Sequence, residues 1–208
     1  MLIHSYIWGP SHVKINIGVH WYITFIDNHN RVCWVYLLKE KYEVVGVFKQ
    51  FHKMILNQFE TNIRILHTDN EREYYPNILG EHLQKEGIIH RVLTLHNKME
   101  CRKKKNRHFL EVAHAMMCQM NIPKVLWGEV ALTKSYFINR KPTHLLKYET
   151  LINTLKQCFI ASHHLFSFLN PKVFGYTTFV HIHGQIVASL ILGHINAFSL
   201  DITYSEWL

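Results

Sequence analysis

The 208-residue sequence lacks several features that would assign a protein to a class at once. Its four cysteines are far apart, and no pair has the CxxC or CxxH spacing of a zinc ribbon or suggests a disulfide framework. The apolar runs are much shorter than the roughly 20 residues of a membrane-spanning helix. No signal peptide opens the chain, and no repeat or low-complexity tract occurs. We therefore expect an intracellular protein, nuclear or cytoplasmic, with no membrane partner.

The composition favours a folded, basic protein. Hydrophobic residues make up 48% of the chain and aromatic residues 13%, which is ample for a packed core. Lys and Arg outnumber Asp and Glu by 23 to 15, a net charge of +8 that favours a polyanionic partner such as nucleic acid. The histidine pairs at 163–164 and 181–183 have no nearby cysteine, so we favour solvent-facing imidazoles over a zinc site.

The apolar periodicity predicts a mixed α/β order with a hairpin at one edge. The expected strands are 3–8, 20–26, 32–38, 63–66 and 88–92, and the expected helices are 40–59, 76–85, 103–120 and 124–139. The stripe expected to be buried on the first helix is Val44, Phe48, Phe51, Ile55 and Phe59. The residues expected to face inward on the later helices are Ile78, Leu79 and Leu83, then Leu110, Ala113, Met117 and Met120, then Leu126, Val130, Leu132 and Phe137. Beyond Pro142 the periodicity weakens, although 173–182 is strand-like.

Short sequence motifs along the chain occur in the same order as in a known family. They are Leu2–Pro10, Phe25–Asp27, Trp34–Lys39, Asp69–Tyr74, Gly87–His90, Lys105–Ala113, Pro123–Pro142 and Phe174–Val180. Together they resemble the integrase catalytic core of copia-type LTR retrotransposon Pol polyproteins. The resemblance implies a ribonuclease-H-like fold, an α/β class with a mixed sheet and flanking helices. It also implies a core-like domain over 1–142 and an eroded, partly ordered C-terminal extension over 143–208.

In this family, three carboxylates hold two divalent ions, Mg²⁺ or Mn²⁺, for polynucleotidyl transfer. Two ions about 3.5–4 Å apart need shared carboxylate oxygens. By the resemblance, the three positions are Tyr6, Asp69 and Lys103. Asp69 is the surviving acid and metal ligand, whereas by spacing alone it would be a turn or cap residue. A phenol with a pKa near 10 is a poor ligand for Mg²⁺, and the charge of a lysine repels cations.

Two further features bear on the site. Glu100 lies three residues before Lys103, but metal-ligand positions tolerate little displacement, so it is an unlikely substitute. The basic run Arg102, Lys103, Lys104, Lys105 and Arg107 is either a solvated helix start or a contact surface for phosphates. The large aromatic residues Trp8, Trp34 and Trp127 are expected to be packing residues.

The hypothesis from sequence is a core whose ancestral role is DNA integration and which now binds nucleic acid with impaired catalysis. DNA, both retroelement ends and target, is the implied partner, and a homo-oligomer is compatible with the resemblance. Two alternatives stay open: an integrase or endonuclease still active with Mg²⁺ or Mn²⁺, and a degenerate reading frame with no selected function.

Overall fold

A computed structural model describes residues 1–9, 18–68, 77–92, 111–112, 115–119 and 121–159. By its internal contacts the chain divides into two units, Met1–Phe168 and Leu169–Leu208. The second unit lies outside the described residues, and so does the expected strand 173–182. Of the expected helix 103–120, the described residues 111–112 and 115–119 are helical.

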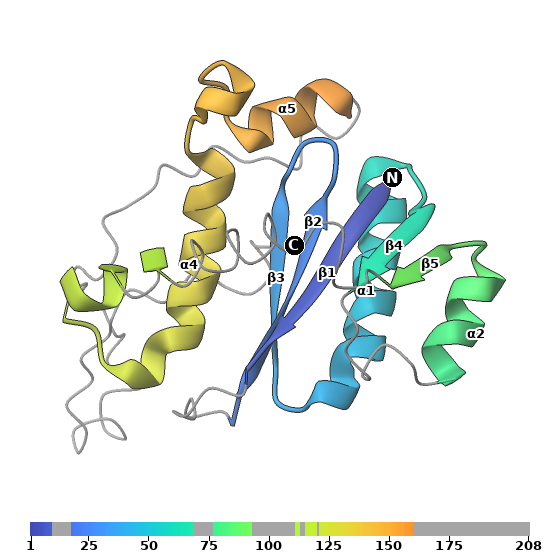
Figure 1. Cartoon of the computed structure of the whole chain (residues 1–208), viewed down its shortest axis with the longest axis horizontal. Coiled ribbons are helices and arrows are strands. Elements are labelled where there is room, and N and C mark those ends of the chain that lie inside the picture. The colour runs from blue at the N-terminus through green and yellow to red at the C-terminus, as the bar shows by residue number, and fades with distance from the viewer. Residues whose placement is uncertain (10–17, 69–76, 93–110, 113–114, 120, 160–208) are drawn as a thin grey trace, which may run out of the picture. The chain divides into compact units, whose positions relative to one another are not determined.

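The centre of the fold is a five-stranded sheet in the order β3-β2-β1-β4-β5 (Figure 1). Its strands are β1 Leu2–Trp8, β2 Trp21–Asp27, β3 Cys33–Leu38, β4 Ile65–Thr68 and β5 Ile89–Val92. The first three strands are antiparallel neighbours, whereas β4 pairs parallel with both β1 and β5. This mixed sheet with flanking helices confirms the predicted α/β class.

Four helices are fully described: α1 Val44–Phe59, α2 Asn77–Lys85, α4 Trp127–Arg140 and α5 Leu151–Cys158. Short 3₁₀ turns precede three of them, at Lys41–Glu43, Lys124–Leu126 and His144–Leu146. The apolar stripe predicted for α1 is confirmed, since all five of its members are buried. The helix ends at Phe59, because the following residue, Glu60, has a left-handed φ of 49° that stops the α conformation.

The main core lies between α1 and one face of the sheet. Phe51 of α1 stacks on Phe25 of β2, with ring centroids 4.2 Å apart and planes 9° apart. Leu151 and Leu155 of α5 belong to the same buried cluster. This short helix was not predicted, because only two of its eight residues are buried, too few to form a period.

Helix α4 packs on the other face of β2 and β3. Along each strand, the residues that face α4 alternate with those that face the main core. Ala131 contacts Tyr22 of β2, whose neighbour Ile23 points to the opposite face, into the α1 core. The prediction for this helix was partly wrong. Val130 is buried, but Leu132 and Phe137 are only half-buried. The other buried residues of α4 are Gly128, Lys134, Ser135 and Asn139, three of which are polar.

The prediction for α2 was wrong at one position. Leu79 and Leu83 are buried, but Ile78 is 59% exposed. A helix this short contacts the core along one narrow face. Leu79 and Leu83 are four residues apart and share that face, whereas the adjacent Ile78 points away from it. The described residues contain no helix with both the length and the apolarity that crossing a membrane requires.

Candidate functional site at the centre of the sheet

The pairing of β1 with β4 sets the geometry of the candidate site. In the parallel register, Ser5 of β1 lies beside Thr68 of β4. Tyr6 follows Ser5, and Asp69 follows Thr68 in the sequence. Asp69 itself lies outside the described residues. The register nevertheless places Ser5 and Thr68, the residues that directly precede these two predicted site positions, side by side on adjacent strands.

On the face of the sheet that carries Tyr6, two histidine side chains lie close to each other. Tyr6 is only 8% exposed, and its ring is parallel to that of His4 within 4°, with centroids 6.4 Å apart. His67, the register neighbour of His4, meets it edge-on at 4.9 Å. His4 is held in turn by a hydrogen bond between its Nε2 and Oδ1 of Asn28, 3.1 Å long. Tyr6, at the position where the family resemblance implies the first acid, is therefore a packed phenol beside the ring of His4, which in turn contacts His67.

The other face of β4 also carries a histidine contact. Oγ1 of Thr68, which is fully buried, lies 2.9 Å from Nε2 of His90 on β5. Burial lowers the pKa of the His90 imidazole below its ordinary value. This contact ties the last residue of β4 to the neighbouring strand, directly before the segment that contains Asp69.

These residues do not fit a pair of magnesium ions. Mg²⁺ prefers oxygen ligands in octahedral geometry, chiefly carboxylates and water. The described site supplies a phenol and imidazoles, and nowhere in the described ranges do three His, Cys, Asp or Glu side chains form a group able to hold a metal. The predicted residues Asp69, Glu100 and Lys103 lie outside the described residues, as do Arg102, Lys104, Lys105 and Arg107.

The structure reveals a buried lysine that the sequence analysis did not single out. Lys134 of α4 is fully buried, and burial lowers its pKa to about 7. Interactions with Cys33 and Glu111 oppose this shift. One signal could have found it: Lys134 lies four residues after Val130 and three after Ala131, on the same face of the helix.

Beside the site, three large aromatic residues form a packed cluster. Trp8 at the end of β1 lies 5.2 Å from Tyr22 and 6.0 Å from Trp127, centroid to centroid. Burial raises the pKa of the Tyr22 phenol well above its ordinary value. Trp34, on the other face, packs 5.4 Å from Phe51. These contacts confirm the prediction that the three tryptophans are packing residues.

Comparison with curated proteins shows clear similarities to retrotransposon polyproteins. The chain is 31% identical, over 185 residues, to the retrovirus-related Pol polyprotein from transposon TNT 1-94 of Nicotiana tabacum, covering 87% of this chain. It is 30% identical, over 150 residues, to that from transposon RE2 of Arabidopsis thaliana, covering 71% of this chain. The chain spans only 13% and 10% of these polyproteins. No protein-family model matches the sequence.

Among solved structures, the fold is similar to the catalytic core domain of HTLV-2 integrase, determined as a trimeric form in complex with magnesium. The TM-score is 0.52 at 11% identity, with 73% of this chain and 93% of that chain covered. This likeness confirms the predicted ribonuclease-H-like fold. In sequence and in fold, the chain belongs to the integrase core-like regions of copia-type Pol polyproteins.

Proposed function

We propose that this chain is an integrase-core domain that binds DNA without catalysing its integration. The observation that carries the proposal is Tyr6, a nearly buried phenol packed beside His4, at the position where the family resemblance implies the first metal-binding acid. A neutral ring cannot replace a carboxylate that is shared between two cations. The proposal therefore separates two properties of the fold, polyanion binding and metal-dependent chemistry.

The charges at the other two positions support the loss of catalysis. Asp69 alone offers one carboxylate to a site that needs several. Lys103, at the third position by the resemblance, brings a positive charge to the place where two cations would bind. The HTLV-2 integrase core was determined with magnesium, and a site of this kind in the present chain would have lost most of the negative charge that attracts the metal.

The positive charge of the chain supports nucleic-acid binding, and this support does not depend on the metal-binding carboxylates. The chain has a net charge of +8, and its basic run from Arg102 to Arg107 is the densest concentration of that charge. Neutralising phosphates releases counterions, so each contact adds affinity that falls with salt. This contribution requires no metal, and it survives the loss of the carboxylates.

Repair of the two altered positions tests the loss of catalysis. The Tyr6→Asp and Lys103→Glu double variant should gain Mg²⁺- or Mn²⁺-dependent strand transfer on retroelement-end DNA, whereas the unaltered chain should show none. Tyr6→Phe with Lys103→Met is the matched control, since it changes both positions without supplying an acid. Metal-dependent strand transfer by the unaltered chain, abolished by Asp69→Ala, would contradict the proposal and favour the active-enzyme alternative.

Salt dependence tests the binding. The logarithm of DNA affinity should fall linearly with the logarithm of salt concentration, by about 0.9 for each phosphate contacted. The triple variant of Lys103, Lys104 and Lys105 to Ala should reduce this slope by about 3, measured by fluorescence anisotropy. The control changes three exposed lysines of α1 and α2, Lys49, Lys53 and Lys85, to Ala, with the same loss of charge. Equal effects of the two triples would refute a role for the basic run.

A further inference from the structure

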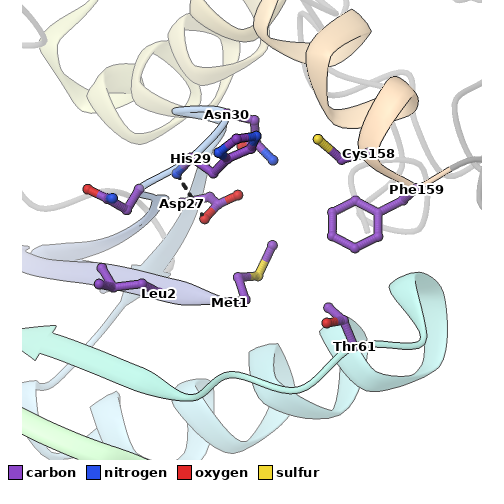
Figure 2. Close-up of a pocket in the computed structure, with 9 residues that line it drawn as sticks. Met1, Leu2, Asp27, His29, Asn30, Thr61, Cys158 and Phe159 are labelled. Carbon is purple, nitrogen blue, oxygen red and sulfur yellow. Dashed lines mark hydrogen bonds between the residues drawn. The ribbon is translucent and has the colours of Figure 1, made fainter.

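A cavity of about 240 Å³ lies at the amino-terminal end of β1 (Figure 2). Met1 and Leu2 line it together with the turn between β2 and β3, Thr61 after α1, and the end of α5. Tyr6 lies several residues further along β1, so the cavity is separate from the candidate site. The function proposed above gives this cavity no role.

The first polar group of the cavity is a buried carboxylate. Asp27, the last residue of β2, is 3% exposed. Among the described residues its carboxylate accepts one hydrogen bond, from the backbone N–H of His29 at 3.3 Å. A buried carboxylate has room for about four such bonds, and leaving it poorly paired is costly. The Met1 α-ammonium interacts electrostatically with Asp27 but takes none of its hydrogen bonds among the described residues, so the carboxylate keeps acceptor capacity for whatever fills the cavity.

The second polar group is a side-chain donor that has no partner in the part of the chain that the structure describes. Asn30 is fully buried, and its Oδ1 accepts the backbone N–H of Val32 at 3.0 Å. That bond fixes the orientation of the amide, because only the oxygen can accept. Among the described residues the Nδ2 group has no hydrogen-bond partner, and Figure 2 shows the amide end directed toward the space between Asp27 and Cys158. A buried donor of this kind calls for an acceptor on a ligand.

The third element is a flat apolar wall. Phe159 follows α5, and its backbone N–H donates to Leu155 O at 3.0 Å. Its ring meets Phe59 of α1 edge-on, with centroids 5.2 Å apart and planes 65° apart. Both contacts hold the aromatic ring in place at the cavity, where it offers a surface for stacking.

We propose that this cavity binds an unpaired nucleobase of the aminopyrimidine type, with cytosine as its representative. The exocyclic amine donates to the Asp27 carboxylate, an acceptor on the same ring edge receives the Asn30 Nδ2 group, and the ring lies against Phe159. A simple ammonium ion satisfies only Asp27, whereas a flat ring with a donor beside an acceptor satisfies both groups. Reading one ring edge by hydrogen bonds while stacking its face is how extruded bases are held.

A free nucleoside and a base in a single strand share this chemistry. A nucleoside carries no phosphate, so its binding does not depend on the basic run proposed above to contact DNA. Failure of the one proposal therefore leaves the other standing.

The test uses Cys158, an exposed thiol that lines the cavity. The rate at which iodoacetamide alkylates it in the full chain is followed by peptide mass spectrometry, with and without cytidine. At ten times its dissociation constant, a ligand leaves about one site in eleven open, so alkylation of Cys158 should slow about tenfold. Cys118, also exposed but outside the cavity lining, is the internal control and should react at an unchanged rate. For a fragment of this size, a dissociation constant of about 1 mM is expected.

Matched changes in ligand and protein identify the contacts. N4,N4-dimethylcytidine lacks the amine donor and should give little protection. Asn30→Asp keeps an oxygen for Val32 N–H but removes the Nδ2 donor, and Phe159→Ala removes the stacking wall. Either variant should weaken protection about tenfold or more, the size expected for losing one good contact. The Phe159 variant leaves the turn intact, so the test does not depend on the folding of the Asn30 variant.

The last arm separates the two sources. Oligodeoxycytidine protecting at much lower concentration than cytidine identifies a base within a strand, and the reverse order identifies a free nucleoside. The proposal is overturned if neither slows alkylation of Cys158, if dimethylcytidine protects as well as cytidine, or if Cys158 without ligand reacts as slowly as the buried Cys33.

Discussion

The side-chain amide of Asn139 forms two hydrogen bonds with the backbone of Cys33, 106 residues earlier in the chain. Its Oδ1 accepts the Cys33 N–H at 2.9 Å, and its Nδ2 donates to the Cys33 carbonyl at 2.8 Å. Ser135, one helical turn earlier, donates to the same carbonyl at 2.8 Å. Because β3 is an edge strand, this amide satisfies backbone groups that have no further strand to pair with. The contact therefore fixes α4 to the sheet.

Replacing Asn139 by Ala should destabilise the fold by about 2–3 kcal/mol, because it leaves the buried Cys33 N–H unpaired. Urea unfolding followed by circular dichroism measures the change. Asn153→Ala is the matched control, since Asn153 is exposed and bonds only Glu149 through its side chain. The control should stay within about 0.5 kcal/mol of the unaltered chain. Equal losses in the two variants would show that the Cys33 contact contributes nothing specific.

Stability should increase as pH rises from 7 toward 10. Burial lowers the pKa of Lys134 from its ordinary 10.5 to about 7. Between these values the unfolded chain binds more protons than the folded chain, so raising the pH favours folding. Above about pH 10 the trend should reverse, because burial raises the pKa of the Tyr36 phenol to about 12 and only the unfolded chain then ionises there.

Calorimetric melting at several pH values between 7 and 9.5 checks the contribution of Lys134. Lys134→Met should flatten the rise, whereas Lys124→Met, on an exposed residue, should leave it unchanged. A melting temperature of the unaltered chain that is constant or falls over this range would refute a neutral buried amine.

Acidification from pH 7 to 5 should destabilise the fold through two histidines. Burial lowers the pKa of His82 and of His90 below 6.5, and the nearby His52 lowers that of His82 further, while Glu86 opposes the shift. In each case the unfolded chain takes up the proton first, so stability is lost as pH falls through the unfolded value.

Urea midpoints at pH 7, 6 and 5 measure this loss. His82→Gln and His90→Gln should each reduce the dependence on pH, while His144→Gln, on an exposed turn, should not. If both the His82 and the His90 variant keep the full acid sensitivity, the loss comes from other groups.

Two glycines should respond to alanine in opposite directions. Gly9 has a φ of 136°, and a Cβ there would lie 2.6 Å from Cε3 of Trp21 and 2.7 Å from the His20 carbonyl oxygen. Gly46 lies within α1 with nothing within 4 Å of an added Cβ. Gly9→Ala should destabilise by more than about 1 kcal/mol, and Gly46→Ala should stabilise by about 0.5–1 kcal/mol. Thermal melting of the two variants checks the pair, and a stabilising Gly9→Ala would contradict the close approach of Trp21 to Gly9.

The sequence predicts much of the fold where an element follows one repeating pattern. The stripe from Val44 to Phe59 is such a case, because five apolar residues at helical spacing have one physical explanation. Boundaries were less accurate: the strand expected at 63–66 is observed at Ile65–Thr68. Ile63 is buried without belonging to the strand. An apolar residue predicts burial, but it does not predict where a strand begins or ends.

The site could be predicted only in part. Tyr6 and Asp69 stay predictions from the family resemblance, whereas the pairing of Ser5 with Thr68 depends on tertiary contacts between residues far apart. The bonds from Asn139 to Cys33 and the burial of Lys134 were missed for a related reason. Polar side chains on a helix predict solvent exposure unless their partners on another element are known.

The two faces of the sheet imply unequal tolerance to mutation. On the α1 face, Phe25 and Phe51 are in direct contact and completely buried, so a change there removes stability from the whole domain. Tyr6 and His67 lie on the opposite face, among rings that surround the candidate site. Selection on folding alone would preserve the first group strictly and would require of the second only that its side chains fill the same space. A chain under that selection would keep the integrase-core architecture long after losing the chemistry for which the architecture is named.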